Sequence, residues 1–282
     1  MKKIGIVGAG LMGSGIAQVA AQTGFEVFLN DLKKEFVEKG LEVIGKNLSR
    51  DVAKGRKTEV EKKILLDRIV ISTNLEDLAT VDLVIEAIYE NMEAKKALFG
   101  KLNTICSPAT ILASNTSGLS ITEIASVTNR PDKVIGMHFF NPVPVMKLVE
   151  IIKGNETSEE TFQQALEVSY KFGKEPITVT EAPLFVVNRI LVPMINEAAF
   201  VLQEGIASAE DIDKGMVLGA NHPIGPLALA DLIGLDTLLM VIDNLYQETA
   251  DSKYRPCPLI KKLVRAGHLG KKTGRGFYQY KE

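Results

Sequence analysis

A glycine-rich turn near the N-terminus constrains the fold of this chain more than any other feature. The sequence Gly8-Ala9-Gly10-Leu11-Met12-Gly13 follows a short apolar run at residues 3–7 and opens a helix of small residues that stops at Gly24. Gly8 allows a tight turn, Gly10 lets phosphate groups approach the backbone, and Gly13 lets the helix pack closely on the strand. Because the N-terminus of a helix attracts negative charge, this pattern predicts a phosphate-binding strand, turn and helix.

An acidic residue completes the pattern. Asp31 ends a second apolar run, at residues 26–31, where its carboxylate would accept hydrogen bonds from the hydroxyl groups of an adenosine ribose. The turn is therefore predicted to bind a dinucleotide, in preference to being a glycine-rich turn of the core. The same carboxylate would repel a 2′-phosphate, which favours NAD over NADP. Lys33 and Lys34 lie close enough to leave tolerance of NADP open.

Short apolar runs alternate with helical stretches over the first 180 residues or so. The runs lack polar alternation, which is typical of strands buried on both faces of a parallel sheet. Ser120 with Glu123, and Thr157 with Glu160, have the spacing of helix-capping pairs. We expect residues 1–184 to form a Rossmann-type α/β domain with a mostly parallel sheet. Its further strands are predicted at residues 69–71, 83–85, 111–113, 134–136, 147–152 and 176–180, and one of its helices at residues 92–103.

The pattern becomes helical after Pro183. Residues 185–282 are therefore expected to form an all-α domain, with strand character only in the Phe277-Tyr278 tail. Such a domain would leave apolar positions uncovered, so we expect a homodimer, or a higher oligomer, to form through it. The helices are predicted at residues 185–204, 208–218, 227–247 and 258–266.

A basic segment interrupts the sheet pattern between the second and third strands. Residues 33–63 contain ten Lys or Arg and six Asp or Glu, whereas the whole chain carries a net charge of −2. The segment predicts a helical insertion over about residues 33–66, with a return helix capped by Thr58 and Glu61. Arg50 and Lys54 lie four residues apart on one helix face and could hold the phosphates of an anionic ligand. A solvated charged helix explains the composition equally well.

Composition excludes several classes of function. A net charge of −2 lacks the basic excess of nucleic-acid and anionic-membrane binders, and no run of 18 apolar residues predicts a membrane span. Glycines interrupt the apolar N-terminus, unlike in a signal peptide. Cys106 and Cys257 lack the paired spacing of a disulfide framework or a zinc site. We therefore expect a cytoplasmic protein that binds small molecules, without a metal.

One histidine stands where α/β sheets bind their ligands. His138 follows the strand predicted at residues 134–137, and an imidazole can exchange a proton near neutral pH while a cofactor moves a hydride. A turn through Pro142-Val143-Pro144 would bring Glu150 beside it, to fix the tautomer and stabilise the imidazolium. On these residues alone, a buried histidine without a catalytic role is the simpler interpretation. We interpret the other histidines, His222 and His268, as structural.

Two further polar residues stand near predicted element ends. Ser117 lies in Ser114-Asn115-Thr116-Ser117-Gly118, directly after the fifth strand, without the GxSxG pattern of acyl-enzyme chemistry. A role in the loop or as a cap is ordinary for such a serine. Asn188, in Val187-Asn188-Arg189, opens the first helix of the second domain and says little by itself.

Together these motifs resemble the 3-hydroxyacyl-CoA dehydrogenase family, over essentially the whole chain. The chain has no hydratase portion, so it is similar to the bacterial monofunctional members. The resemblance implies reversible, NAD-linked hydride transfer between (3S)-3-hydroxyacyl-CoA and 3-oxoacyl-CoA, in the cleft between the two domains. The expected partners are the four-carbon pair 3-hydroxybutyryl-CoA and acetoacetyl-CoA. The motifs are the glycine turn, residues 114–117, residues 138–142 with Glu150, residues 187–189, Gly225-Pro226-Leu227 with Gly234-Leu235-Asp236, and Gly274-Arg275-Gly276-Phe277-Tyr278.

The resemblance also implies a role for each matched residue. His138 would be the general base in oxidation and the general acid in reduction, with Glu150 orienting it. Ser117 and Asn188 would position the oxygen atoms of the substrate, and Ser117 would also lie near the nicotinamide. Asp31 would hold the adenosine ribose, and the other implied cofactor contacts are Glu90, Lys95, Asn115, Asn141 and Lys272. The basic insertion would hold the phosphates of CoA through Asn47, Arg50 and Lys54.

Two other interpretations are weaker. A Rossmann dehydrogenase for free hydroxy acids would need an arginine-centred carboxylate clamp or a lysine base in the helical domain, and the sequence offers no convincing motif for either. A non-catalytic protein on the same fold would have no use for Ser117, His138, Glu150 and Asn188 together.

Overall fold

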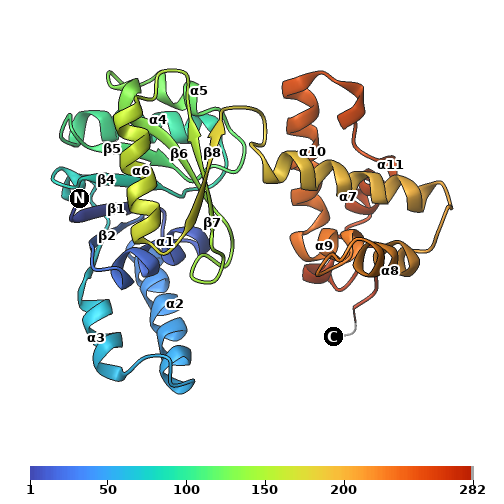
Figure 1. Cartoon of the computed structure of the whole chain (residues 1–282), viewed down its shortest axis with the longest axis horizontal. Coiled ribbons are helices and arrows are strands. Elements are labelled where there is room, and N and C mark those ends of the chain that lie inside the picture. Colours follow the sequence, from blue (N-terminus) through green and yellow to red (C-terminus); the bar gives the residue numbers. More distant parts are fainter. Residues whose placement is uncertain (281–282) are drawn as a thin grey trace. The chain divides into compact units, whose positions relative to one another are not determined.

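The computed structural model describes residues 1–280 and divides into two compact units, Met1–Phe185 and Val186–Glu282. Figure 1 shows the first unit in blue to yellow and the second in yellow to red. Every helix among the described residues is either too short or too polar to cross a lipid bilayer.

The first unit is built on one sheet, to which eight strands of the described chain contribute. The strand order is β3-β2-β1-β4-β5-β6-β7-β8. Neighbouring strands are parallel except at β6 and β7, which are antiparallel. This confirms the predicted Rossmann-type, mostly parallel sheet. The strands are β1 (Lys3–Val7), β2 (Glu26–Asn30), β3 (Ile69–Ser72), β4 (Leu83–Glu86), β5 (Ile111–Ser114), β6 (Val134–Phe139), β7 (Leu148–Lys153) and β8 (Glu175–Thr180).

Helices cover both faces of this sheet, as its apolar strands require (Figure 1). Successive residues of β4 illustrate the arrangement: Leu83 and Ile85 pack into the core beneath α1 and α6, and Val84 packs into the core beneath α4 and α5. The covering helices are α1 (Leu11–Gln22), α4 (Met92–Ile105), α5 (Ile121–Ala125) and α6 (Glu159–Lys171), with short 3-10 turns η1 (Leu75–Leu78) and η2 (Pro131–Lys133).

The predicted helix starts are partly wrong. At α6 the cap is Ser158, whose Oγ accepts a hydrogen bond from Thr161 N at 3.2 Å, and not Thr157 with Glu160. The Thr157 hydroxyl is engaged away from the helix start, because it accepts from Gly154 N at 2.9 Å and donates to Val134 O at 2.7 Å. Ser120 caps α5 as predicted, but the Glu123 carboxylate pairs with Lys96 at 3.2 Å.

The basic segment forms a helical hairpin between β2 and β3, as predicted. Its helices are α2 (Lys34–Ala53) and α3 (Glu59–Asp67), and Thr58 and Glu61 form a reciprocal capping box at the start of α3. Buried Val37, Ile44 and Leu48 of α2 belong to the core that also contains α1. The outer face of α2 stays free for charged side chains.

The second unit is helical, as predicted, with one correction. The single helix expected at residues 227–247 is two helices, because Gly234 between them adopts a φ of 99° that no regular helix contains. The apolar periodicity continues across this glycine, so it gave no sign of the break. The helices are α7 (Val187–Gln203), α8 (Ala209–Gly219), α9 (Pro226–Ile233), α10 (Leu235–Thr249) and α11 (Pro258–Arg265), with 3-10 turns η3 (Ser252–Tyr254) and η4 (Lys271–Thr273).

The C-terminal tail is held by a buried aspartate in place of a strand. Asp231 of α9 accepts hydrogen bonds from the N–H groups of Phe277 and Tyr278, each at 2.9 Å, and from the Tyr280 hydroxyl at 3.0 Å. Only isolated β-bridges, such as Arg275 with Gln279, occur in the described part of the tail. The Gly274–Tyr278 motif is thus explained by packing within this unit.

Both cysteines are free and buried. Burial raises the pKa of the Cys106 thiol to about 11, which keeps it neutral at physiological pH. Cys106 belongs to the core beneath α4 and α5, and Cys257 belongs to the core of the second unit. Neither side chain offers a reactive thiolate.

Candidate active site

The glycine turn between β1 and α1 has the geometry that its sequence predicts. Gly8 has a φ of +103°, and a Cβ atom there would lie 2.5 Å from Ala87 O. A Cβ atom on Gly13 would lie 1.7 Å from Gly8 O, so helix and turn pack too closely for any side chain. A Cβ atom on Gly10 would meet no atom of the described chain within 4 Å, apart from its neighbours in sequence. Gly10 therefore leaves open space at the N-terminus of α1, where a phosphate group fits.

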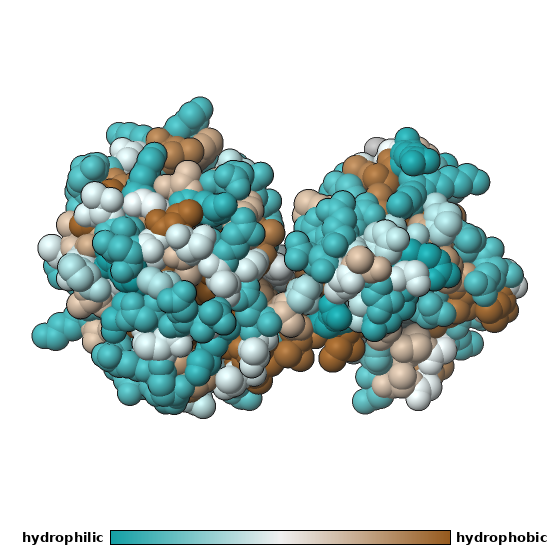
Figure 2. Space-filling view, turned by 90° about the horizontal axis from the view of Figure 1, so that it is seen from above, coloured by the Kyte–Doolittle hydropathy of each residue, from teal (hydrophilic) through white to brown (hydrophobic). Residues whose placement is uncertain are grey.

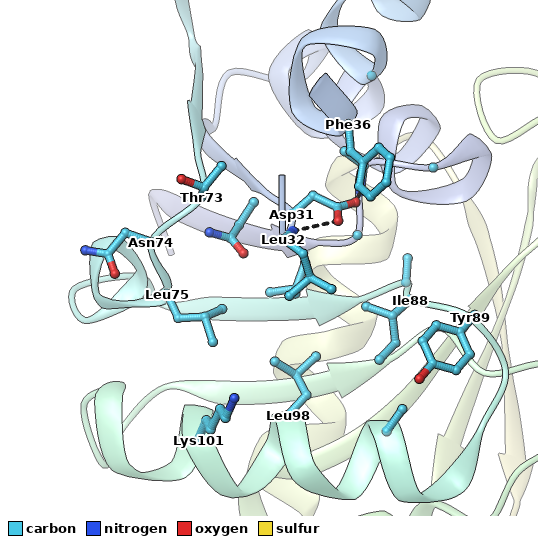
Figure 3. A pocket seen from close by; sticks show the side chains of 18 of the residues that line it. Asp31, Leu32, Phe36, Thr73, Asn74, Leu75, Ile88, Tyr89, Leu98 and Lys101 are labelled. Atoms are coloured by element: carbon cyan, nitrogen blue, oxygen red, sulfur yellow. Dashed lines mark hydrogen bonds between the residues drawn. The ribbon is translucent and has the colours of Figure 1, made fainter. Parts of the chain in front are cut away.

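A cavity of about 1580 Å³ adjoins this turn within the first unit. Its walls include Gly8 to Leu11 of the turn, Asp31 and Leu32 after β2, and Leu98 and Lys101 of α4. Leu98 points toward Leu32 across the cavity (Figure 3). The volume exceeds that of ordinary pockets for small molecules, and suits an extended ligand such as a dinucleotide.

The Asp31 carboxylate is fixed where the sequence predicts a ribose contact. Its Oδ2 accepts a hydrogen bond from Ala9 N and its Oδ1 accepts one from Leu32 N, each at 2.7 Å. A carboxylate oxygen has a second acceptor position, so both oxygens retain capacity for ribose hydroxyl groups. The ammonium groups of Lys33 and Lys34 pair with Glu35 and Glu38 on the surface, each at 3.4 Å.

His138 and Glu150 form a buried hydrogen-bonded pair. They face each other in the antiparallel register of β6 and β7, and His138 Nδ1 lies 2.7 Å from Glu150 Oε2. The Glu150 side chain is fully buried and that of His138 is 8% exposed. The predicted turn and pairing are thus confirmed. Because a carboxylate accepts, Nδ1 is the donor, and a neutral imidazole then carries its lone pair on Nε2.

The carboxyl ends of β4, β5 and β6 bring the remaining polar residues together. Asn115, directly after β5, accepts a hydrogen bond on its Oδ1 from Phe139 N of β6 at 2.9 Å. Ser117, two residues further, donates from its N and its Oγ to Glu90 Oε1, at 2.9 and 3.1 Å. This is the edge of a parallel sheet at which α/β proteins bind ligands.

Lys95 is placed differently from a simple cofactor contact. Its side chain is 1% exposed, and its Nζ lies 2.6 Å from Glu86 Oε1 and 3.2 Å from Glu90 Oε2. Glu86 is not among the residues predicted from sequence, although one signal was present: it is the acidic last residue of the buried strand Leu83-Val84-Ile85-Glu86.

Other predicted site residues lie in varied settings. Asn141 is exposed just after β6, and Asn47 of α2 donates from Nδ2 to Gln18 Oε1 at 3.2 Å. Arg50 and Lys54 are exposed at the end of α2, as a role in binding phosphates requires. In the second unit, Asn188 lies in the first turn of α7, and Lys272 pairs with Asp236 at 2.6 Å. Their roles stay predictions.

Comparison with known proteins identifies the family. Residues 3–182 match the family model for the NAD binding domain of 3-hydroxyacyl-CoA dehydrogenase, and residues 185–280 match the model for its C-terminal domain. The chain belongs to the 3-hydroxyacyl-CoA dehydrogenase family. It is an NAD-dependent enzyme, and the Gly8–Gly13 turn, the cavity and Asp31 fit that cofactor.

Several members of this family are similar to the whole chain. The probable 3-hydroxybutyryl-CoA dehydrogenase of Bacillus subtilis is 57% identical over 100% of this chain and 98% of its own length. The 3-hydroxybutyryl-CoA dehydrogenase of Clostridioides difficile is 53% identical over 99% of each chain. The crystal structure of (S)-3-hydroxybutyryl-CoA dehydrogenase from Ralstonia eutropha superposes with a TM-score of 0.98, at 53% identity over 100% of both chains.

The glycine turn of this dehydrogenase yields a direct test of cofactor binding. We expect Gly10→Ala to fold normally, because the new methyl group meets no described neighbour, and to bind NADH at least about tenfold more weakly, because the methyl group occupies the space for phosphate. NADH fluorescence titration measures the affinity, and thermal unfolding checks the fold. Gly45→Ala on α2, which also has open space around it, is the matched control. Unchanged NADH affinity in Gly10→Ala would contradict this placement of the phosphates.

Proposed function

We propose that this enzyme interconverts (3S)-3-hydroxybutyryl-CoA and acetoacetyl-CoA by NAD-linked hydride transfer. The observation that carries the proposal is the buried pair of His138 Nδ1 and Glu150 Oε2, at 2.7 Å, at the carboxyl edge of the sheet. The four-carbon acyl chain is supported by the names of relatives that are 53–57% identical over nearly the whole chain.

The proposed chemistry assigns one proton to His138. In oxidation, Nε2 takes the proton of the C3 hydroxyl group while the C3 hydride leaves, and in reduction the imidazolium returns that proton. Bound NAD supplies the hydride acceptor. Glu150 keeps the second ring nitrogen protonated, and its charge stabilises the imidazolium that forms. The Phe140 ring packs against the imidazole, with 4.5 Å between the two ring centroids.

We assign binding of the substrate to two groups of residues. Ser117 and Asn188 are proposed to position the oxygen atoms of the acyl group, as the family resemblance implies. The basic hairpin of α2 and α3 is proposed to hold the CoA phosphates. This proposed binding of phosphates is supported by the local excess of positive charge in the hairpin. Arg50 and Lys54 are exposed near Asn47 at the end of α2.

Substitution of the proposed relay tests the mechanism. His138→Ala should lower kcat by about 10²- to 10⁴-fold, the usual contribution of a general base. Glu150→Gln should lower kcat by at least about a hundredfold, because an amide cannot stabilise the imidazolium. NADH affinity should stay nearly unchanged in both variants. Glu175→Gln on β8, an exposed glutamate paired with Lys147, is the control. Near-normal turnover by folded His138→Ala would refute the assignment of the base.

A second assay tests the substrate. NADH oxidation should be fastest with acetoacetyl-CoA, and kcat/KM should fall at least about tenfold with acetoacetyl-pantetheine, which lacks the adenosine phosphates that the hairpin would hold. Free acetoacetate should be the poorest substrate. Longer 3-oxoacyl-CoA compounds and NADPH, in the same assay, define the chain-length range and the cofactor preference. Equal rates with free acetoacetate would indicate a hydroxy-acid dehydrogenase, and no oxidation with any compound would indicate a non-catalytic protein.

We also propose that the second unit forms a homodimer. Large apolar side chains are exposed on it, among them Ile190 at 67% and Leu218 at 73%, and Figure 2 shows hydrophobic groups at several places on its surface. Light scattering should give twice the mass of one chain over a wide concentration range. A monomeric mass throughout that range would refute the proposal.

A further inference from the structure

A buried ion pair lies close to the turn that contains Ser117 (residues 116–119, the Ser117 turn). Neither member of the pair takes part in the proposed proton transfer. Glu86 and Lys95 are 0% and 1% exposed, with 2.6 Å between Oε1 and Nζ. Glu86 also accepts hydrogen bonds from Ile88 N at 2.7 Å and, on its other oxygen, from Ser114 Oγ at 2.6 Å. The pair thus joins the end of β4 to the first turn of α4 and to the end of β5.

Stability alone is a poor account of this pair. Desolvation of two buried charges offsets most of their attraction, and well-packed apolar side chains often replace such pairs without loss of stability. The pair does, however, fix the position of a specific neighbour, Glu90. Lys95 Nζ also lies 3.2 Å from Glu90 Oε2, so one ammonium group holds both carboxylates.

Glu90 links the ion pair to the Ser117 turn through hydrogen bonds. While its Oε2 pairs with Lys95, its Oε1 accepts hydrogen bonds from Thr116 Oγ1 at 2.6 Å, Ser117 N at 2.9 Å and Ser117 Oγ at 3.1 Å. Without the ammonium group, the charges of Glu86 and Glu90 would repel each other across a site of low polarity. Glu90 would then move toward solvent and release the serine.

The hydrogen bond to Glu90 fixes the direction in which the Ser117 hydroxyl donates its proton. A hydroxyl group has a single proton, and Ser117 donates it to a carboxylate, which can only accept. We propose that Glu86 and Lys95 are positioning residues that hold Glu90 and thereby fix the orientation of the Ser117 hydroxyl. The importance of Ser117 for turnover rests on the proposed function.

A double-mutant cycle tests this route. Lys95→Met should lower kcat for acetoacetyl-CoA by about tenfold when Ser117 is present and by less than about twofold in the Ser117→Ala background, because coupled residues are not additive. Lys96→Met is the matched control: Lys96 is the next residue of α4 and also contacts two glutamates, Glu93 and Glu123, but on the surface. An equal loss of kcat from Lys95→Met in both backgrounds would overturn the proposal.

A second variant and a structural readout complete the test. Glu86→Gln keeps the shape of the side chain, and its smaller loss of kcat should depend on Ser117 in the same way, so the cycle can be measured even where Lys95→Met does not fold. Crystal structures should show the Ser117 Oγ to Glu90 hydrogen bond retained in Lys96→Met and lost or lengthened in Lys95→Met or, where that variant does not fold, in Glu86→Gln. An unchanged hydrogen bond would overturn the proposal. This readout does not need turnover, so an inactive parent enzyme would refute only the proposed function.

Discussion

The reversal of strand direction between β6 and β7 is the constraint on which the candidate active site depends. Six parallel strands bring their carboxyl ends to one edge of the sheet, and a seventh parallel strand would require a crossover helix before it could join them. A tight turn instead returns the chain antiparallel, which places Glu150 directly opposite His138 in the register. Each buried group therefore finds its hydrogen-bond partner within twelve residues of chain, as burial of polar groups requires.

Features determined by residues close together in the chain were predictable from the sequence. Features that depend on packing between distant segments were not. The glycine turn, Asp31 and the Thr58–Glu61 box each have a fixed spacing with a direct physical cause. The cap of α6 lies one residue further along, because the Thr157 hydroxyl accepts from Gly154 N and donates to Val134 O of β6, which lies far away in sequence. The break at Gly234 was hidden, because apolar periodicity runs through it and a glycine in a helical pattern does not always end the helix.

The candidate site shows the same division. His138 with Glu150 was predictable, because both lie on adjacent strands joined by a short turn rich in proline. The cluster of Glu86, Glu90 and Lys95 was not, since it joins a strand end, a loop and a helix whose approach is set by the core beneath α4. A lysine in a helical pattern reads as a solvated side chain, and only its burial shows otherwise.

The two carboxylates of the site act in the same way on different partners, because each accepts a hydrogen bond and thereby orients the group that donates it. Glu150 accepts a hydrogen bond from Nδ1 of His138, which leaves the lone pair of a neutral imidazole on Nε2, and Glu90 accepts a hydrogen bond from Ser117 Oγ, which fixes the direction of that hydroxyl. In the proposed reaction the proton of the C3 hydroxyl group goes to that Nε2, so the orientation that Glu150 imposes on the imidazole is the one that oxidation needs.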